Sequence, residues 1–220
     1  MQITLPLTVK SSYQLDDFII SSSNKIAYDK IVAWQNSWGV DPYKSAILIH
    51  GPRSSGKTYL VKIWQNISCA SYILPKPKII ENIEKLLPLY SNFILEDIDK
   101  AWSEKELLHC FNLLNEHKKF ILLTASSSFF NFKLHDLISR LNSLLKIEIK
   151  SPDDQLLKLL LFKYFSNQSI ILPAPILDFL ITILPREFEQ IMNFLIKINQ
   201  ETLVGKRKIT IPMIKKILEI

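Results

Sequence analysis

The stretch Gly51-Pro52-Arg53-Ser54-Ser55-Gly56-Lys57-Thr58 fits the pattern G-x-x-x-x-G-K-[ST]. A loop with glycine at both ends can wrap a phosphate and direct backbone N–H groups at it. The lysine of this pattern places a positive charge on the outer phosphates, and the threonine offers its hydroxyl to Mg²⁺. The chain has only four glycines, and two of them stand at the two required positions. These eight residues predict a phosphate-binding loop, or P-loop.

The residues on either side predict a strand before the loop and a helix after it. Ala46-Ile47-Leu48-Ile49-His50 is short and apolar, as buried strands are, and residues 59–65 have a helical pattern. This order places the positive end of the helix dipole beneath the phosphates. The alternative is a chance match in a surface turn. The nucleotide-binding residues that we expect here are Gly51, Pro52, Arg53, Ser54, Ser55, Gly56, Lys57, Thr58 and Tyr59.

Further short apolar segments predict the rest of a sheet. They lie at 71–74, 92–96, 120–124 and 145–149, and helical patterns lie between most of them. Ser103 is a candidate N-cap, with Glu106 at the third helical position, for a helix that ends at Glu116. A helix is also expected over residues 24–38. Alternating strands and helices predict an α/β fold with a parallel sheet and right-handed crossovers.

The strand patterns stop after Ser151-Pro152, and the remainder predicts helices alone. They are expected at 153–164, 174–183, 186–200 and 212–219, with proline or glycine between them. We therefore expect three parts: a flexible tail over 1–12, an α/β domain over 13–152 and an all-helical domain over 153–220.

The composition is that of a globular protein, with 48% hydrophobic residues and a net charge of +6. This charge permits an anionic partner without requiring one. The basic clusters at 76–78 and 206–208 are expected to be solvated loops. No apolar run reaches about 18 residues and no secretory signal is visible, so no membrane contact is expected. Cys69 and Cys110 are interpreted as reduced thiols of a cytoplasmic protein.

Acidic residues follow the predicted strand at 92–96. A P-loop needs a carboxylate at the end of a neighbouring strand to hold Mg²⁺ through its water shell. Phe93-Ile94-Leu95-Glu96-Asp97-Ile98-Asp99 supplies Glu96 and Asp97. One acid would serve the metal and the other would polarise an attacking water, and the sequence leaves open which does which. The alternative is an acidic loop with no metal.

Three other polar residues are site candidates. Ser126 follows the strand predicted at 120–124, where it would face a γ-phosphate or simply form a turn. Arg140 is placed to reach the nucleotide site of an adjacent molecule and neutralise transition-state charge, or to pair with Asp136 four residues earlier. Arg186, after Pro185, would contact phosphates if the helical domain folds over the nucleotide.

Together these residues resemble the Hda/DnaA-like AAA+ family over residues 13–220. The segment Tyr13-Gln14-Leu15-Asp16-Asp17-Phe18, with Asn24 and Ala27-Tyr28, is similar to the one that lines the base pocket of that module. Residues 108–115 resemble its helix after the Walker B acids. Ser139-Arg140-Leu141 resembles its arginine-finger segment, and Pro185-Arg186-Glu187 the start of its sensor II helix. The resemblance implies an AAA+ five-stranded parallel sheet sandwiched by helices, a small all-α lid, and ADP or ATP with Mg²⁺ as cofactors, with Asn24 and Arg186 at the nucleotide.

The N-terminal segment Gln2-Ile3-Thr4-Leu5-Pro6-Leu7 is similar to the Q-[L/I]-x-L-P-L clamp-binding motif of Hda-type members. Leu5 and Leu7 would fill apolar pockets, Pro6 would reduce the ordering cost, and Gln2 would direct hydrogen bonds, with Ile3 between them. The alternative is a plain first strand. Residues 207–212 also resemble the Hda type. The chain ends with the lid, so we expect no C-terminal DNA-binding domain, and the short 72–92 stretch implies that the initiator's helices for single-stranded DNA are trimmed.

The resemblance implies a regulator of replication initiation. It would bind the DNA polymerase III β sliding clamp through residues 2–7 and use Arg140 to stimulate hydrolysis by the DnaA AAA+ domain. It would contact DNA only indirectly and lie in the cytoplasm with the replisome and nucleoid, and self-association is left open. Two departures argue for weak hydrolysis by this chain itself: Glu96 replaces the usual Walker B aspartate, although Asp97 follows as a catalytic candidate, and Ser126 replaces the sensor I acid. The alternative function is a DnaA-related AAA+ ATPase that loads or remodels proteins on DNA; a P-loop kinase fits less well.

Overall fold

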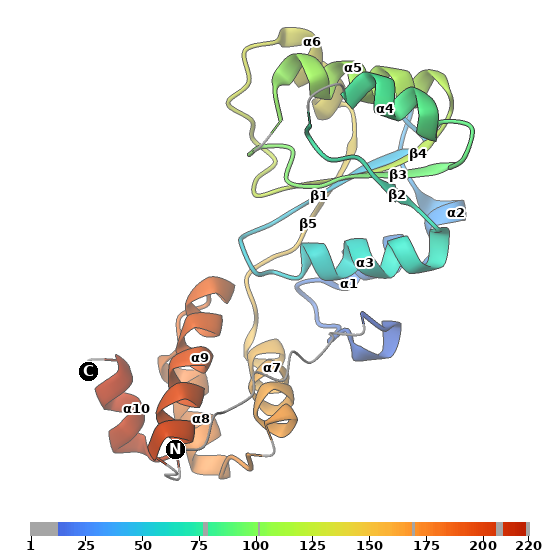
Figure 1. The fold of residues 1–220 in the computed structure, drawn as a ribbon. Helices are drawn as coiled ribbons and strands as arrows, with labels where there is room; N and C mark the ends of the chain where they lie inside the picture. The colour runs from blue at the N-terminus through green and yellow to red at the C-terminus, as the bar shows by residue number, and fades with distance from the viewer. Residues whose placement is uncertain (1–12, 77–78, 101, 169, 206–208, 219–220) are drawn as a thin grey trace.

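The computed structural model describes residues 13–76, 79–100, 102–168, 170–205 and 209–218. Five parallel strands form one sheet in the order β2-β3-β4-β1-β5 (Figure 1). The strands are β1 (Ala46–His50), β2 (Ser71–Tyr72), β3 (Asn92–Leu95), β4 (Phe120–Ala125) and β5 (Leu145–Glu148). The predicted parallel α/β sheet is thus confirmed.

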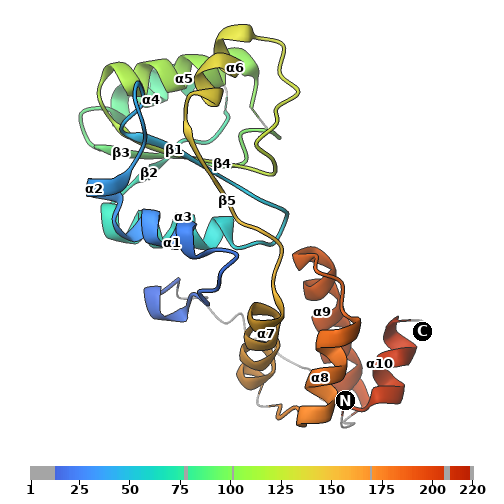
Figure 2. The same ribbon diagram turned by 180° about the vertical axis from the view of Figure 1, so that it is seen from behind.

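Helices cover both faces of the sheet, as Figure 2 shows from behind. One layer contains α1 (Lys25–Val32), α2 (Trp34–Ser37) and α3 (Lys57–Ser68), and the other contains α4 (Ile79–Leu86), α5 (Glu104–Glu116) and α6 (His135–Asn142). The alternation of side chains along β1 explains this arrangement, because Ile47 and Ile49 pack with the α1–α3 layer while Leu48 packs with the α4–α6 layer. Strands buried on both faces need apolar residues at nearly every position, which is what the sequence provides.

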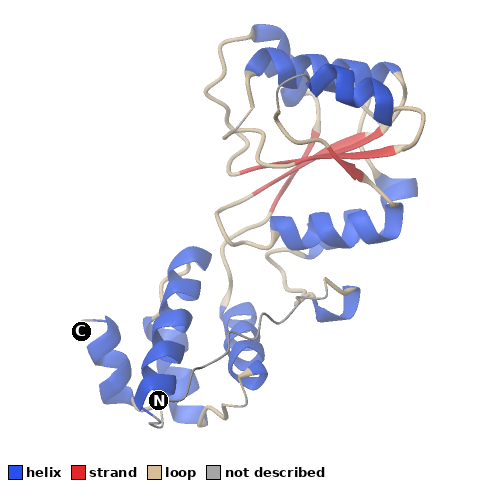
Figure 3. Cartoon of the chain, in the orientation of Figure 1, coloured by secondary structure: helices blue, strands red, loops and turns tan. Residues whose placement is uncertain are grey.

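The helical lid follows β5 (Figure 3). It has its own hydrophobic core. It consists of α7 (Asp154–Asn167), α8 (Ala174–Ile183), α9 (Phe188–Gly205) and α10 (Ile211–Leu218). Its first helix begins at an N-cap, where Asp153 Oδ1 accepts the Leu156 N–H at 2.7 Å. A similar cap begins α5, where Ser103 accepts the Glu106 N–H at 3.3 Å, as predicted. Among the described residues, we find no helix with the length and apolar character needed to span a bilayer.

Several element boundaries differ from the sequence-based expectations. The helix expected over 24–38 is divided into α1 and α2, because Ala33 leaves helical geometry with a ψ of 27°. The strand expected over 71–74 keeps two residues as β2. The helix expected from residue 186 begins at Phe188, and the first carbonyl to accept a helical bond is that of Glu187, from the Ile191 N–H. Arg186 therefore lies in the loop before α9.

Candidate functional site

The loop between β1 and α3 requires glycine at its first position for steric reasons. A Cβ on Gly51 would lie 2.6 Å from the carbonyl oxygen of Ile149, which follows β5. Gly56 is the N-cap of α3 and has a φ of 97°, a left-handed conformation that favours glycine. Ser54 also has a positive φ, 60°. The backbone thus forms a tight cradle immediately before the N-terminus of α3, where N–H groups are free to bind an anion.

The ammonium group of Lys57 lies inside this cradle. The side chain is 7% exposed, and Nζ donates to the carbonyl oxygens of Gly51 and Pro52, each at 2.7 Å. Burial lowers the pKa of Lys57, and the nearby Asp97 carboxylate opposes this shift. Lys57 thus places a cation where the loop backbone converges.

Thr58 and Glu96 come together from different elements. The Thr58 hydroxyl donates to Glu96 Oε1 at 2.5 Å, which links the first turn of α3 to the residue after β3. A polar cavity of about 370 Å³ lies beside them. Its lining residues are Arg53, Ser54, Ser55, Gly56, Lys57, Thr58, Asp97 and Lys100. Sequence reasoning missed Lys100, whose Nζ lies 3.1 Å from Asp97 Oδ2, because a lysine after an acidic loop resembles any surface cation.

The oxygen atoms here fit Mg²⁺, which favours hard oxygen ligands and is usually held by one or two carboxylates together with phosphates and water. Thr58 and Glu96 would hold the ion, Asp97 lines the same cavity as Thr58, and the metal would neutralise charge on phosphate oxygens. The described residues contain no cluster of three or more His, Cys, Asp or Glu side chains that forms a metal site by itself. The side chains present therefore suit a metal that binds together with a phosphate ligand.

Two polar residues that sequence reasoning did not assign hold the acidic loop in place. The fully buried Thr124, at the end of β4, accepts the Asp97 N–H with its hydroxyl at 3.0 Å. This bond supports Asp97 in a left-handed conformation with a φ of 51°. Asp99 Oδ2 accepts the Ser126 N–H at 2.9 Å, so Ser126 is joined to the acidic loop through its backbone. A polar residue at the end of an apolar strand was the available signal for Thr124.

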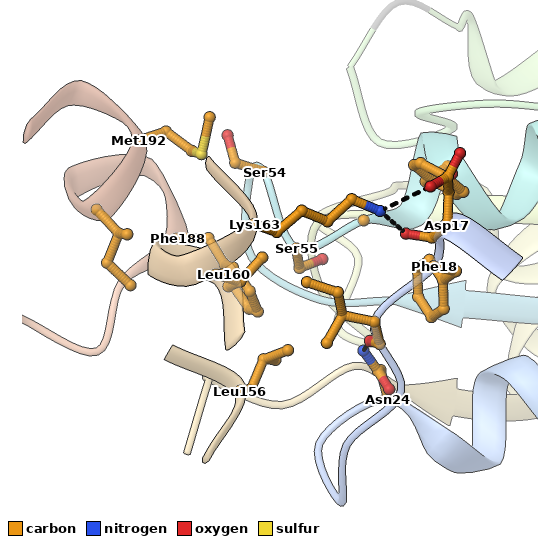
Figure 4. Close-up of a pocket in the computed structure, with 14 residues that line it drawn as sticks. Asp17, Phe18, Asn24, Ser54, Ser55, Leu156, Leu160, Lys163, Phe188 and Met192 are labelled. Atoms are coloured by element: carbon orange, nitrogen blue, oxygen red, sulfur yellow. Dashed lines mark hydrogen bonds and ion pairs between the residues drawn. The ribbon is translucent and has the colours of Figure 1, made fainter. Parts of the chain in front are cut away.

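An apolar cavity of about 270 Å³ lies beside the P-loop (Figure 4). Its lining residues are Asp17, Phe18, Ile19, Asn24, Ser54, Ser55, Gly56, Tyr59, Leu156, Leu160, Lys163, Phe188, Ile191 and Met192. The N-terminal segment, the P-loop and the lid helices α7 and α9 all contribute. Ser54, Ser55 and Gly56 line both cavities, so one continuous loop separates an apolar chamber from a polar one.

Two predicted residues, Asn24 and Tyr59, lie at the apolar cavity in fixed positions. The Asn24 amide donates to the Ile19 carbonyl and accepts the Ser21 N–H, both at 2.9 Å. Asn24 therefore shapes the backbone that lines the cavity. Tyr59 donates its hydroxyl to the Gln14 carbonyl at 3.1 Å, and its ring centroid lies 5.3 Å from that of Phe18.

Direct contacts join the lid to the α/β domain around this cavity. Lys163 of α7 lies 3.1 Å from Asp17 Oδ1 and also donates to the Asp17 carbonyl oxygen (Figure 4). Ser22 donates to Asp153 at 2.6 Å. In the loop itself, Arg53 pairs with Glu189 of α9 at 3.4 Å. The lid is thus attached to the N-terminal segment and to the P-loop.

The two candidate arginines outside the P-loop line neither cavity. Arg186 pairs with Asp154 at 2.6 Å and donates to the Ile181 carbonyl at 2.8 Å, so its described partners belong to the lid. Arg140, on α6, donates to Asp136 at 3.2 Å, which is the i, i+4 pair that the sequence predicted as an alternative. It also donates to the Tyr43 hydroxyl at 3.2 Å.

Arg140 lies near the end of the sheet at which the parallel strands begin, and the P-loop lies at the end at which they finish. Tyr43, the partner of Arg140, comes before β1, whereas Gly51 comes directly after it. A strand of five residues spans roughly 16 Å. The candidate clamp-binding residues Gln2, Ile3, Leu5, Pro6 and Leu7 lie outside the described residues.

Comparisons with known proteins agree with this architecture. The family model described as "Hda, lid domain" matches residues 153–218. The chromosomal replication initiator protein DnaA of Nautilia profundicola is 27% identical over 242 residues, which cover 98% of this chain and 54% of that protein. The chain spans about half the length of the curated relatives it matches.

Solved structures show the same fold. Domain III of the Thermotoga maritima replication initiation protein DnaA aligns with a TM-score of 0.73 at 18% identity, over 95% of this chain and 96% of that one. AMPPCP-bound DnaA from Aquifex aeolicus aligns with a TM-score of 0.65 at 20% identity, over 88% of this chain and 66% of that one.

The parallel sheet, the glycine-bounded loop after β1 and the helical lid define an AAA+ module. Within this class, residues 153–218 match the lid domain of Hda, and nearly the whole chain is similar to chromosomal replication initiator proteins DnaA. The predicted fold is therefore confirmed, and the predicted resemblance to Hda and DnaA is supported.

Proposed function

We propose that this protein is a nucleotide-binding regulator of replication initiation. The observation that carries the proposal is the pair of adjoining cavities that share Ser54, Ser55 and Gly56. ADP or ATP would place its base in the apolar cavity and its phosphates in the polar one. Backbone N–H groups at the start of α3 and the Lys57 ammonium would bind the phosphates, and Thr58 and Glu96 would hold Mg²⁺.

Hydrolysis by this chain would be weak under the proposal. Asp97 is the candidate to orient an attacking water, but its carboxylate lies 3.1 Å from Lys100. Ser126, the sensor I candidate, meets the acidic loop through its backbone N–H. Arg186 remains the candidate sensor II residue, and it would have to leave Asp154 to reach a phosphate. The nucleotide would thus act mainly by fixing the lid against the α/β domain.

Arg140 would act on a second protein. The P-loop of its own chain lies at the far end of β1. Asp136 and Tyr43 orient the Arg140 guanidinium group near the end at which this strand begins. The relation to DnaA favours the DnaA AAA+ domain as the partner. Arg140 would enter its nucleotide site and neutralise charge as the phosphoryl group is transferred, an effect of about 10³–10⁵ in rate where arginine fingers are known.

The N-terminal residues 2–7 would tether the regulator to the DNA polymerase III β sliding clamp. Leu5 and Leu7 would fill apolar pockets in an extended conformation that Pro6 favours. This tether would bring the regulator to the replisome without direct DNA contact.

The central experiment measures ATP hydrolysis by DnaA in the presence of this protein. Wild type is expected to stimulate hydrolysis. Arg140→Ala should lose this stimulation while it keeps its own nucleotide affinity, and Arg140→Lys should recover little because lysine lacks the planar fork. Lys197→Ala, at an exposed position of α9, is the matched control. Normal stimulation by Arg140→Ala would remove the finger assignment.

Two binding measurements test the remaining parts. Calorimetry with ADP and ATP should show binding that Lys57→Ala weakens strongly. Replacing Gln2, Leu5 and Leu7 by alanine should abolish clamp binding and leave the circular dichroism spectrum unchanged. Clamp binding by the triple variant at wild-type affinity would exclude residues 2–7 as the tether.

A further inference from the structure

Helix α7 is apolar on three sides, and the described part of the chain covers only two of them. One side packs in the lid core through Leu161 and Phe165, and a second lines the apolar cavity through Leu160. The third side carries Leu159 and Phe162, whose side chains are 39% and 66% exposed. A helix that is apolar all round is one that is buried all round. The third side of α7 is therefore a surface that a further segment would cover.

A groove of about 410 Å³ continues this third side towards the loop between α7 and α8. Its lining residues are Phe162, Phe165, Ser166, Ile170, Ile171, Leu172 and Leu177. The loop is held against the end of α7, because the Ile170 N–H donates to the Phe165 carbonyl at 2.9 Å. Beside it, the Ile171 side chain is 94% exposed. The groove is thus preformed, and no charged side chain lines it.

The segment at residues 13–24 is attached to α7 one helical turn from this groove. Lys163 of α7 lies 3.1 Å from Asp17 Oδ1 and also donates to the Asp17 carbonyl oxygen. Ser166, which lines the groove, comes three residues after Lys163 and so lies on the same side of the helix, about 5.4 Å further along it. Figures 1 and 2 both place α7 between the segment 13–24 and the helices α8 and α9. The groove therefore opens close to the point at which this segment meets the lid.

Residues 1–12 precede the first described residue, Tyr13, and they are long enough to reach the groove. The Tyr13 carbonyl accepts a hydrogen bond from a side chain of α3 at 3.3 Å, which fixes the starting point. An extended chain spans roughly 3.5 Å per residue, so Asp17 lies at most about 14 Å from Tyr13. By the same measure, Leu7 can lie up to about 20 Å and Ile3 up to about 35 Å from Tyr13.

The chemistry of these residues matches the groove. Ile3, Leu5 and Leu7 occupy alternate positions, so an extended backbone would direct all three side chains to one side. Residues 2–9 include no charged side chain, so their burial in an apolar groove leaves no unpaired charge. The covalent link also raises their local concentration to about the millimolar range, which favours them over a separate molecule.

We propose that residues 3–7 dock in the lid groove of their own chain, with Ile3, Leu5 and Leu7 against Phe162 and Ile171. The same two leucines are those that would fill pockets on the sliding clamp, so docking in the lid and binding to the clamp exclude each other. The docking stands on the groove alone, whereas the exclusion rests on the proposed function. The lid thereby withholds the tether until a clamp competes for it.

Paramagnetic relaxation in the full chain tests the docking. A nitroxide is attached at Thr4→Cys in a Cys69→Ser background, because Cys69 is exposed and would react. Cys110 is fully buried, and burial raises the pKa of its thiol to about 12, so it stays unlabelled. The label should broaden the amide signals of Ser166 and Ile171.

Variants show whether the broadening depends on the proposed contact. The double variant Leu5→Ser with Leu7→Ser should remove it, and Phe162→Ser should do the same from the side of the groove. Ile196→Ser, at a position of α9 that is 46% exposed, is the matched control and should retain it. The signal of Leu89, after α4 in the layer away from the lid, should stay sharp throughout. No broadening in the labelled chain, or broadening that survives the double variant, would overturn the docking.

A mixture of two chains identifies the other occupant of the groove. One chain carries the nitroxide without isotope, and the other carries ¹⁵N without the nitroxide. We expect no broadening at Ser166 or Ile171 in this mixture, because each groove is filled from its own chain. Broadening as strong as in the singly labelled chain would show that a second copy supplies the segment, and it would overturn the proposal.

Clamp affinity tests the exclusion. Phe162→Ser should bind the DNA polymerase III β clamp about three- to tenfold more tightly than wild type, because apparent affinity is reduced by the fraction of chains that can bind. Ile196→Ser should match wild type. Equal affinity of Phe162→Ser and wild type would overturn the exclusion. No clamp binding by either protein would refute the tether and the exclusion together, and the relaxation measurements would still decide the docking.

Discussion

The Thr58 hydroxyl donates to Glu96 Oε1 at 2.5 Å, although the two residues belong to α3 and to the loop after β3. Sequence reasoning left open which of Glu96 and Asp97 would serve a metal. This hydrogen bond favours Glu96, because the same hydroxyl is the one that a P-loop offers to Mg²⁺. The longer glutamate side chain reaches Thr58 directly, while Asp97 lines the polar cavity and pairs with Lys100.

Thr58→Val should remove the Mg²⁺ dependence of nucleotide binding. Valine has a similar shape and lacks the hydroxyl, so the metal loses one ligand and Glu96 loses its donor. A hydrogen bond to a charged group contributes roughly 1.5–3 kcal/mol, so the affinity for Mg²⁺–ATP should fall by about tenfold or more. Calorimetry with ATP in Mg²⁺ and in EDTA measures this, with Thr182→Val on the surface of α8 as the control. A Mg²⁺-dependent gain in the Thr58→Val variant would contradict the assignment.

Met192→Trp should weaken the binding of ATP without weakening the binding of phosphates alone. Met192 lines the apolar cavity but not the polar one, so the larger ring fills space that a base would need. We expect the affinity for ATP to fall by about tenfold or more, since overpacking costs about 1–3 kcal/mol, while the affinity for inorganic triphosphate stays the same. Met192→Leu, of similar volume, is the control. Equal losses for ATP and triphosphate would show that the substitution acts on the P-loop instead.

Asp153→Asn should remove the pH-dependent contribution that the Asp153 carboxylate makes to the stability of the folded protein. The hydrogen bond from Ser22 and the bond from the Leu156 N–H lower the pKa of Asp153 in the folded protein. A lowered folded pKa stabilises the protein above the unfolded value, about 3.9, and this stabilisation is lost as the pH falls through the folded pKa. Asparagine caps helices about as well as aspartate and does not titrate.

The melting temperature of wild type should therefore exceed that of Asp153→Asn at neutral pH, and the difference should shrink as the pH falls below about 4. Asp178→Asn, on the exposed surface of α8, is the control for a change in net charge. A difference that stays constant or grows on acidification would show that the Asp153 carboxylate does not stabilise the contact between Ser22 and the lid.

The sheet was predictable because strands buried on both faces need continuous apolar runs, and β1 was predicted with its exact bounds. The break at Ala33 was not, because the apolar periodicity continues on both sides of it and only the backbone of Ala33 leaves helical geometry. Arg186 was placed in a helix for a similar reason: a residue after proline suits a first turn, but here its guanidinium group is held by Asp154 and Ile181.

The site was predictable where its residues are contiguous. Gly51 to Thr58 form one loop, and Glu96 and Asp97 follow one strand. The apolar cavity could be predicted only in part from the sequence. Leu156, Phe188 and Met192 line it from lid helices, and the docking of these helices depends on tertiary contacts. Thr124 and Asp99 act by accepting hydrogen bonds from backbone N–H groups at the end of a neighbouring strand. These contacts join residues that are far apart in the sequence, so the sequence pattern does not reveal them.

The separation of Arg140 from Gly51 along β1 has a consequence for assembly. A contact that joins the Arg140 edge of one module to the P-loop edge of another uses two different surfaces. Such a contact is heterologous, so repetition leads to a ring or a helical filament, whereas a two-fold dimer would pair each surface with itself. A row of such modules has two different ends. Whatever its length, one end carries a nucleotide site that no arginine enters, and the other end carries an Arg140 that enters no nucleotide site.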